Sequence, residues 1–162
     1  MKKIQPWLGL AARLILGGTL IAAGYLKFDE LDKSQMAVRA YEMLPIPLAN
    51  FLGIVVPFFE LAVGILLVIG AGVRISAALS AILMIAFMIA ITQAWARGLS
   101  IDCGCFGGGG QVPEGEANYL TPLLRDTGLA LLGIYLTFFP HTKFGLDKKP
   151  QSATQLGEGT HG

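Results

Sequence analysis

Four long apolar runs constrain this chain more than any other feature of its sequence. They cover about residues 7–26, 51–70, 75–95 and 119–139. Each approaches the roughly 20 residues that an α-helix needs to cross a hydrocarbon core about 30 Å thick. Because lipid cannot hydrogen-bond the backbone, continuous apolar runs of this length must be helical. The sequence therefore predicts an all-α integral membrane protein, a four-helix bundle in contact with the lipid bilayer.

Composition agrees with a lipid-embedded chain. Charged residues make up 14% of the sequence, whereas a typical soluble domain has about 25%. The net charge of +1 gives no electrostatic basis for binding nucleic acid. Lys2 and Lys3 precede the first run, as in a secretory signal. However, the run is longer than the roughly 7–15 residues of a signal core, and no Ala-x-Ala site follows it, so we interpret it as a retained span.

The four runs predict one membrane domain over residues 1–146, followed by a disordered polar tail over 147–162. The fourth run is the weakest, because its strictly apolar part, 127–139, is too short to cross alone. A fourth span must therefore include Arg125 and Asp126, which places a charged pair at one membrane boundary.

The segment between the first two spans mixes polar and apolar residues. Its apolar side chains recur at helical spacing, at Met36, Ala40, Met43 and Leu44. This spacing predicts a short amphipathic helix on the membrane surface, with an ordinary ordered loop as the alternative.

The distribution of basic residues predicts the orientation in the membrane. Four spans place both termini on one side, together with Lys2, Lys3, Arg74, Lys143, Lys148 and Lys149. The opposite side carries slightly fewer: Lys27, Lys33, Arg39, Arg97 and Arg125. Since cytoplasmic loops are enriched in Lys and Arg, we expect a multi-pass plasma-membrane protein with cytoplasmic termini. The loop between the third and fourth spans, and the short helix, would then be extracytoplasmic.

That loop contains the chain's only two cysteines, in the run Asp102-Cys103-Gly104-Cys105-Phe106-Gly107. With one residue between them, the sulfurs can join only if the backbone bends sharply, which Gly104 permits. So short a loop gains little from chain entropy, and a strained bridge exchanges readily. The motif therefore favours a redox-active pair at Cys103 and Cys105. An inert structural bridge and an intersubunit metal site are the alternatives.

A metal site within one chain is not predicted, because zinc or an iron–sulfur cluster needs further ligands. The only histidines, His141 and His161, belong to the opposite side in this topology. Charges near the thiols act in both directions. Asp102 disfavours a thiolate, whereas Arg97 and Arg125 favour one. Arg97, Arg125 and Asp126 therefore either tune the thiols or anchor the fourth span to the loop.

Glu60 is an ionisable residue near the middle of the second span. An unpaired charge at that depth costs at least a few kcal/mol, so Glu60 should face the bundle interior and have a partner. Arg13 and Lys27 of the first span are the candidates. We favour a structural ion pair, with a proton-transfer or quinone-proximal site as the alternative.

Together these residues resemble the MauE family, within the wider group of DoxX-like four-helix membrane proteins. The resemblance covers about residues 8–140 and rests on Ala23-Gly24 with Lys27, Tyr41 with Leu44-Pro45, Pro57 with Glu60 and Gly64, Arg97-Gly98-Leu99, the cysteine run, and Arg125-Asp126. It implies a redox-associated membrane protein that acts with a thioredoxin-like partner, as MauE does in the maturation of disulfide-rich methylamine dehydrogenase. The implied dithiol role falls on Cys103 and Cys105. Nothing in the chain itself indicates methylamine as a substrate.

Three functional hypotheses follow. The first is a thiol–disulfide exchange protein that assists oxidative maturation of other proteins, with a quinone between the helices if electrons cross the membrane. The second is a non-enzymatic scaffold or assembly factor that holds a redox partner. The third, a small proton-coupled transporter using Glu60, is disfavoured because the sequence shows no inverted repeat. No sequence feature specifies an oligomeric state.

Overall fold

The computed structural model describes residues 5–106 and 108–140. Along these residues the elements are α1 (Gln5–Asp29), α2 (Leu31–Ala40), α3 (Ile46–Ile69), α4 (Val73–Ala96), β1 (Ile101–Asp102), β2 (Gly110–Gln111) and α5 (Leu120–Phe138). The predicted all-α membrane bundle is confirmed, with two short strands added. The tail predicted to be disordered, 147–162, lies outside the described residues.

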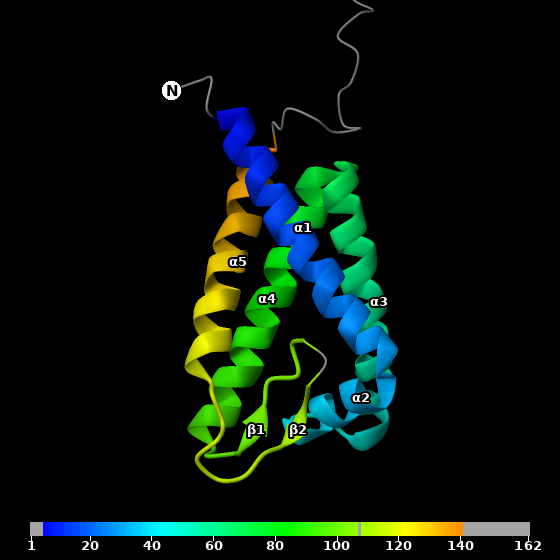
Figure 1. Cartoon of the computed structure of the whole chain (residues 1–162), viewed down its shortest axis with the longest axis vertical. Helices are drawn as coiled ribbons and strands as arrows, with labels where there is room; N and C mark the ends of the chain where they lie inside the picture. The colour runs from blue at the N-terminus through cyan, green and yellow to red at the C-terminus, as the bar shows by residue number, and fades with distance from the viewer. Residues whose placement is uncertain (1–4, 107, 141–162) are drawn as a thin grey trace, which may run out of the picture.

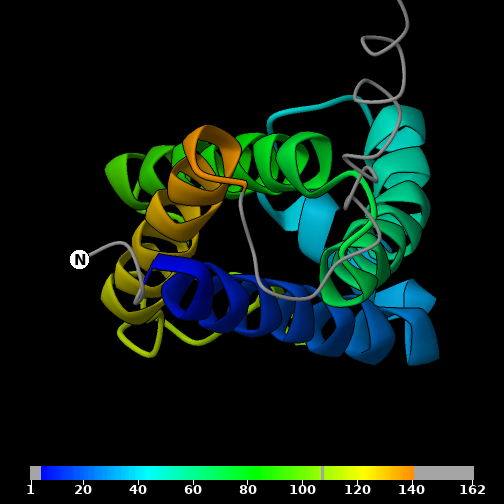
Figure 2. The ribbon, with the colours of Figure 1, turned by 90° about the horizontal axis from the view of Figure 1, so that it is seen from above.

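The four long helices run alongside one another and form two tightly packed pairs (Figures 1 and 2). Helix α1 packs along α3, and α4 packs along α5; α3–α4 and α1–α5 contacts close the bundle. The core between them is apolar and includes Leu16, Leu20, Leu67 and Leu136. Large apolar side chains also cover the outside, among them Ile75, Ile82, Leu124 and Leu131. In a membrane protein such a surface contacts lipid.

Glycines allow α1 and α3 to approach closely. A Cβ atom added at Gly17 would lie 2.9 Å from the carbonyl oxygen of Gly64, and one at Gly24 would lie 2.8 Å from that of Pro57. Small residues at such positions let helix backbones pack without intervening side chains. Gly18 is different, since an added Cβ there would meet nothing within 4 Å. Of the adjacent glycines Gly17 and Gly18, only Gly17 is needed for the close contact between α1 and α3.

Three helices are long and apolar enough to cross a membrane: Trp7–Asp29, Ile46–Ile69 and Val73–Ala96. The second begins at Ile46 rather than near residue 51, because Pro45 precedes the helix and Pro47 lies in its first turn, where a missing N–H costs no hydrogen bond. Helix α5 is not among the three. This matches the weakness expected from its charged pair, although α5 lies along α4 in Figure 1.

The short helix predicted between the first two spans is present as α2, so the ordinary-loop alternative is wrong. It ends at Ala40, however, and Met43 and Leu44 lie beyond it. Its buried residues are Ser34 and Ala37 rather than Met36. The Ser34 hydroxyl donates a hydrogen bond of 2.7 Å to the Gly53 carbonyl of α3. This bond ties α2 to α3 at the end of the bundle away from the N-terminus (Figure 1).

The cysteine segment begins and ends in a two-stranded antiparallel ribbon at the same end of the bundle as α2. Ile101 pairs with Gln111, and Asp102 pairs with Gly110. The connection between the strands turns back toward the helices (Figure 1). The sequence predicted a loop here without strands. Two-residue strands are too short to produce a hydrophobic alternation.

Candidate functional site

The cysteine loop, which we define as residues 103–106 together with 108 and 109, is packed against α2. Gly104 and Gly109 have positive φ angles of 64° and 145°. A Cβ atom added at Gly104 would lie 2.5 Å from the Cβ of Ala37, and one added at Gly109 would lie 2.3 Å from it. Only glycine therefore fits at these two positions. Tyr41, just after α2, donates a hydrogen bond of 2.9 Å to the Cys103 carbonyl. Gly104 and Gly109 therefore allow the loop to pack closely on α2.

The two cysteines are free thiols in unlike surroundings. Cys105 is 6% exposed, whereas Cys103 is half-buried. The Cys105 backbone N–H donates to Cys103 Sγ at 3.4 Å, and Cys105 Sγ donates to the Cys103 carbonyl at 3.7 Å. Hydrogen bonding from Cys105 lowers the pKa of Cys103 to about 7. The side-chain hydrogen bond with Cys103 is the largest cause that raises the pKa of Cys105 well above its ordinary value, and burial is the second. Cys103 is therefore the better nucleophile near neutral pH.

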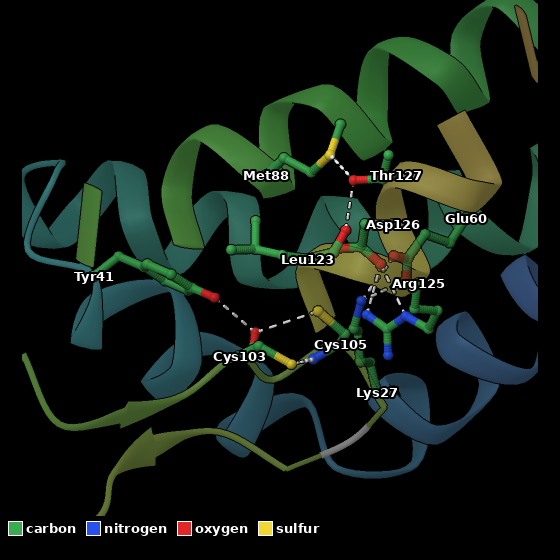
Figure 3. A network of polar contacts seen from close by, with 10 residues as sticks. All are labelled: Lys27, Tyr41, Glu60, Met88, Cys103, Cys105, Leu123, Arg125, Asp126 and Thr127. Atoms are coloured by element: carbon green, nitrogen blue, oxygen red, sulfur yellow. Dashed lines mark hydrogen bonds and ion pairs between the residues drawn. The ribbon is translucent and has the colours of Figure 1, made fainter. Parts of the chain in front are cut away.

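Cys105 borders a small cavity of about 10 Å³ together with Glu60, Arg125 and Asp126. The rest of the lining is largely apolar: Leu20, Ala23, Met84, Phe87, Phe106 and Leu129, with Thr19. This volume is about enough for one water molecule. The loop thus brings a thiol to buried charged residues from α3 and α5 (Figure 3).

Arg125 and Asp126 form a close ion pair at the start of α5. Two nitrogens of Arg125, Nε and one terminal nitrogen, lie 2.8 and 2.7 Å from Asp126 Oδ1. The guanidinium also lies over the Phe106 ring, 4.6 Å from its centre. Its positive charge favours the thiolate of both cysteines, although hydrogen bonding and burial outweigh this effect at Cys105 and keep its pKa raised. Asp126 is 1% exposed, and its second oxygen, Oδ2, has no hydrogen-bond partner among the described residues.

Lys27 is the residue that the structure brings to Glu60. Lys27 Nζ lies 2.7 and 2.8 Å from the two Glu60 carboxylate oxygens, and both side chains are buried. The ammonium also lies 5.0 Å from the centre of the Phe87 ring. Arg13, the other predicted candidate, is buried at 3% exposure but lies on α1 roughly 20 Å along the helix axis from Lys27. It does not reach Glu60.

The other two predicted site residues lie around the loop rather than at the cavity. Arg97 donates at 3.3 Å to the carbonyls of Tyr41 and Glu42, and pairs with the Glu42 carboxylate at 3.2 Å. Arg97 therefore connects the end of α4 to the segment after α2. Asp102 is exposed on β1, and its negative charge partly opposes the lowering of the Cys103 pKa.

Sequence analysis assigned no role to Tyr41, although it was part of the family resemblance. Burial, reinforced by the nearby cysteines, raises the pKa of Tyr41 well above its ordinary value, so the phenol stays neutral and remains a donor. The sequence signal that could have identified Tyr41 is its position directly after a predicted amphipathic helix.

No group of three or more His, Cys, Asp or Glu residues that could hold a metal occurs in residues 5–106 and 108–140. His141 and His161 lie outside these ranges.

The fold and site define a multi-pass helical membrane protein whose dithiol loop packs against one end of its bundle. The sequence matches the family described as Methylamine utilisation protein MauE over residues 5–139. It is similar to the methylamine utilization protein MauE of Paracoccus denitrificans, with 32% identity over 129 residues that cover 79% of this chain and 69% of that relative. The chain therefore belongs to the MauE family, as the resemblance predicted. No solved structure matches it.

Proposed function

We propose that this protein exchanges disulfides with a thioredoxin-like partner through Cys103 and Cys105, and so assists the oxidative maturation of other proteins. The proposal places the pair on the extracytoplasmic side of the plasma membrane. The names of the family and of the Paracoccus relative associate such proteins with methylamine utilisation. We adopt that setting as part of the proposal and no particular substrate.

The difference between the two thiols is the observation that carries this proposal. An exchange protein needs one accessible thiol of low pKa to attack, and a second, protected thiol to resolve the mixed disulfide. Cys103 has a pKa of about 7 and is half-buried, whereas Cys105 is buried and has a raised pKa. A purely structural bridge requires no such difference.

The exchange proceeds in two balanced steps. The Cys103 thiolate attacks one sulfur of the partner's disulfide, and the other partner sulfur leaves as a thiolate. Cys105 then attacks Cys103 Sγ, forms the Cys103–Cys105 disulfide and releases the partner's second thiolate. The partner gains the two electrons that the pair loses. Passing a disulfide to a reduced partner is the reverse sequence through the same mixed disulfide.

The proposal includes four membrane crossings. Helix α5 would cross alongside α4, with the Arg125–Asp126 ion pair near the boundary at the cysteine end. The apolar outer side chains Leu124, Leu131 and Phe138 would then contact lipid. These two steps use no quinone; one would be needed only if the electrons then cross the membrane.

A trapping experiment tests the exchange. Membranes containing wild-type protein, Cys103→Ser or Cys105→Ser would be mixed with a thioredoxin that keeps only the first cysteine of its pair, carried as a mixed disulfide with nitrothiobenzoate, then quenched and analysed for protein–thioredoxin disulfides. Because this probe has no second thiol, it cannot reverse the mixed disulfide. Cys105→Ser should accumulate a covalent complex through Cys103, because the resolving thiol is missing. The matched Cys103→Ser variant should accumulate little, because Cys105 is buried. Trapping through Cys105 alone, or no trapping by either variant, would refute the proposed roles.

A scaffold function is the second candidate, and one observation favours it. The loop is fixed by the Tyr41 hydrogen bond and by packing on Ala37, without a disulfide. Its shape could therefore form a docking surface for a redox partner. The double variant Cys103→Ala/Cys105→Ala separates the two functions: it abolishes exchange under the first proposal, whereas under the second it weakens partner binding at most.

A further inference from the structure

We propose that Asp126 accepts the proton that Cys105 loses when it attacks the mixed disulfide, and returns that proton in the reverse reaction. The inference rests on the exchange proposed above. It assigns to a buried carboxylate a function beyond anchoring the start of α5.

The need for an acceptor follows from the position of Cys105. Its thiol must become a thiolate to attack Cys103, yet at 6% exposure it has little access to bulk water. A buried proton transfer needs a base within hydrogen-bond reach or one water molecule away. The cavity beside Cys105 has room for about one water molecule and is bordered by two carboxylates, Glu60 and Asp126.

Hydrogen bonding distinguishes these two carboxylates. Both oxygens of Glu60 accept hydrogen bonds from Lys27 Nζ, at 2.7 and 2.8 Å. Asp126 binds Arg125 through Oδ1 only, while Oδ2 is buried and has no hydrogen-bond partner in the described part of the chain. An unsatisfied buried carboxylate oxygen is costly and calls for an explanation. Accepting a proton, directly or through the cavity water, gives Oδ2 a role.

Figure 3 shows Cys105, the Arg125 guanidinium and Asp126 in one cluster with Lys27 and Glu60. Arg125 of α5 and Lys27 of α1 are the charged groups that act on Asp126. The charge of Asp126 in turn acts on three groups: Tyr41 after α2, Glu60 of α3 and Cys105 of the loop. From α4, Met84 and Phe87 border the cavity and carry no charge. Asp126 is the carboxylate positioned to exchange a proton with Cys105 beside a fixed guanidinium.

The step is balanced in atoms and electrons. The S–H bond of Cys105 breaks, its proton moves to Asp126 Oδ2, and its electron pair forms the bond to Cys103 Sγ. The bond between Cys103 and the partner sulfur breaks, and the partner leaves as a thiolate. The partner disulfide is the oxidant, and the protein dithiol is oxidised.

A small disulfide probe separates the two chemical steps. Reduced protein in detergent would be mixed with one equivalent of 5,5′-dithiobis(2-nitrobenzoate). Attack by Cys103 releases the first coloured nitrothiolate, and closure by Cys105 releases the second. In Asp126→Asn we expect the first release to be no slower than in the wild type, because the freed Arg125 guanidinium favours the Cys103 thiolate. The second release should be slowed by about 100-fold, a typical loss when a general base is removed.

The substitution distinguishes proton transfer from a purely electrostatic role. Asparagine keeps an oxygen that can accept a hydrogen bond from Arg125, but it lacks the negative charge of aspartate. If Asp126 only neutralised Arg125, the freed guanidinium would favour the Cys105 thiolate, and closure would become faster. Slower closure in Asp126→Asn, restored in Asp126→Glu, supports the proposal; unchanged or faster closure overturns it. Thr127→Val, an exposed neighbouring change on α5, is the control and should close at the wild-type rate.

The wild-type protein provides a test that does not depend on the folding of a variant. If closure required prior loss of the Cys105 proton to bulk solvent, its rate would rise about tenfold per pH unit below the Cys105 pKa. With an internal acceptor the rate stays nearly constant between about pH 6 and 8. A tenfold slope would overturn the role of Asp126 but leave exchange intact. Absence of a second release at every pH would instead refute the exchange itself.

Discussion

At the scale of single residues, the contrast between the two thiols depends on the hydrogen bonds that join them. We predict that the alkylation rate of Cys103 in reduced protein rises with pH and is half-maximal near its pKa of about 7. Cys105→Ala removes the hydrogen bond from the Cys105 side chain, which contributes most to the low pKa of Cys103. The midpoint should therefore move upward, and less Cys103 thiolate should be present at neutral pH. Mass spectrometry of the Cys103 peptide after iodoacetamide pulses measures it. An unchanged midpoint would contradict this origin of the low pKa.

The Lys27–Glu60 ion pair gives a second prediction at this scale. Removing one partner of a buried pair typically costs about 3–5 kcal/mol, because the other charge is left uncompensated. Lys27→Met should therefore lower the thermal unfolding temperature in detergent strongly. The double variant Lys27→Met/Glu60→Gln removes both charges and should recover most of the loss. Equal instability of the single and double variants would show that the pair's charge is not what stabilises the bundle.

At the scale of elements, adjacent glycines on α1 provide a matched comparison. A methyl group at Gly17 would meet the Gly64 carbonyl and Val68, each at 2.9 Å, whereas one at Gly18 meets nothing within 4 Å. Gly17→Ala should separate α1 from α3 and cost about 1–3 kcal/mol, as overpacking does. Gly18→Ala should be neutral or stabilising by up to about 1 kcal/mol, because alanine is the better helix former. Unfolding temperatures in detergent test both, and equal effects would contradict the contact.

The elements also differ in how far the sequence could predict them. Helices α1, α3 and α4 were predictable because each is a long apolar run, and only their ends moved, as at Pro45 and Pro47. The buried face of α2 was not predictable, since Ser34 and Ala37 pack on partners distant in sequence. The same is true of the site: the spacing of Cys103 and Cys105 was visible, but the neighbourhood of Cys105 and Asp126 exists only after α5 packs on α4.

At the scale of the whole molecule, the arrangement of the ends predicts how the protein lies in the membrane. The start of α1, the turn between α3 and α4 and the end of α5 lie at one end of the bundle, and the cysteine loop lies at the other (Figure 1). If the bundle spans the bilayer, these two ends face opposite compartments. From the slight excess of basic residues near the termini we then predict that the loop lies outside.

Thiol labelling of intact cells tests this orientation. After mild reduction, a membrane-impermeant maleimide should label Cys103 in Cys105→Ser from outside. As the control, Ala71→Cys in the α3–α4 turn, made in a Cys103→Ser/Cys105→Ser background, should react only after the membrane is opened. The reverse pattern would place the pair in the reducing cytoplasm, where disulfides do not persist. Because the proposed relay needs an oxidising compartment, that one result would remove its basis while leaving the fold and the geometry of the site unchanged.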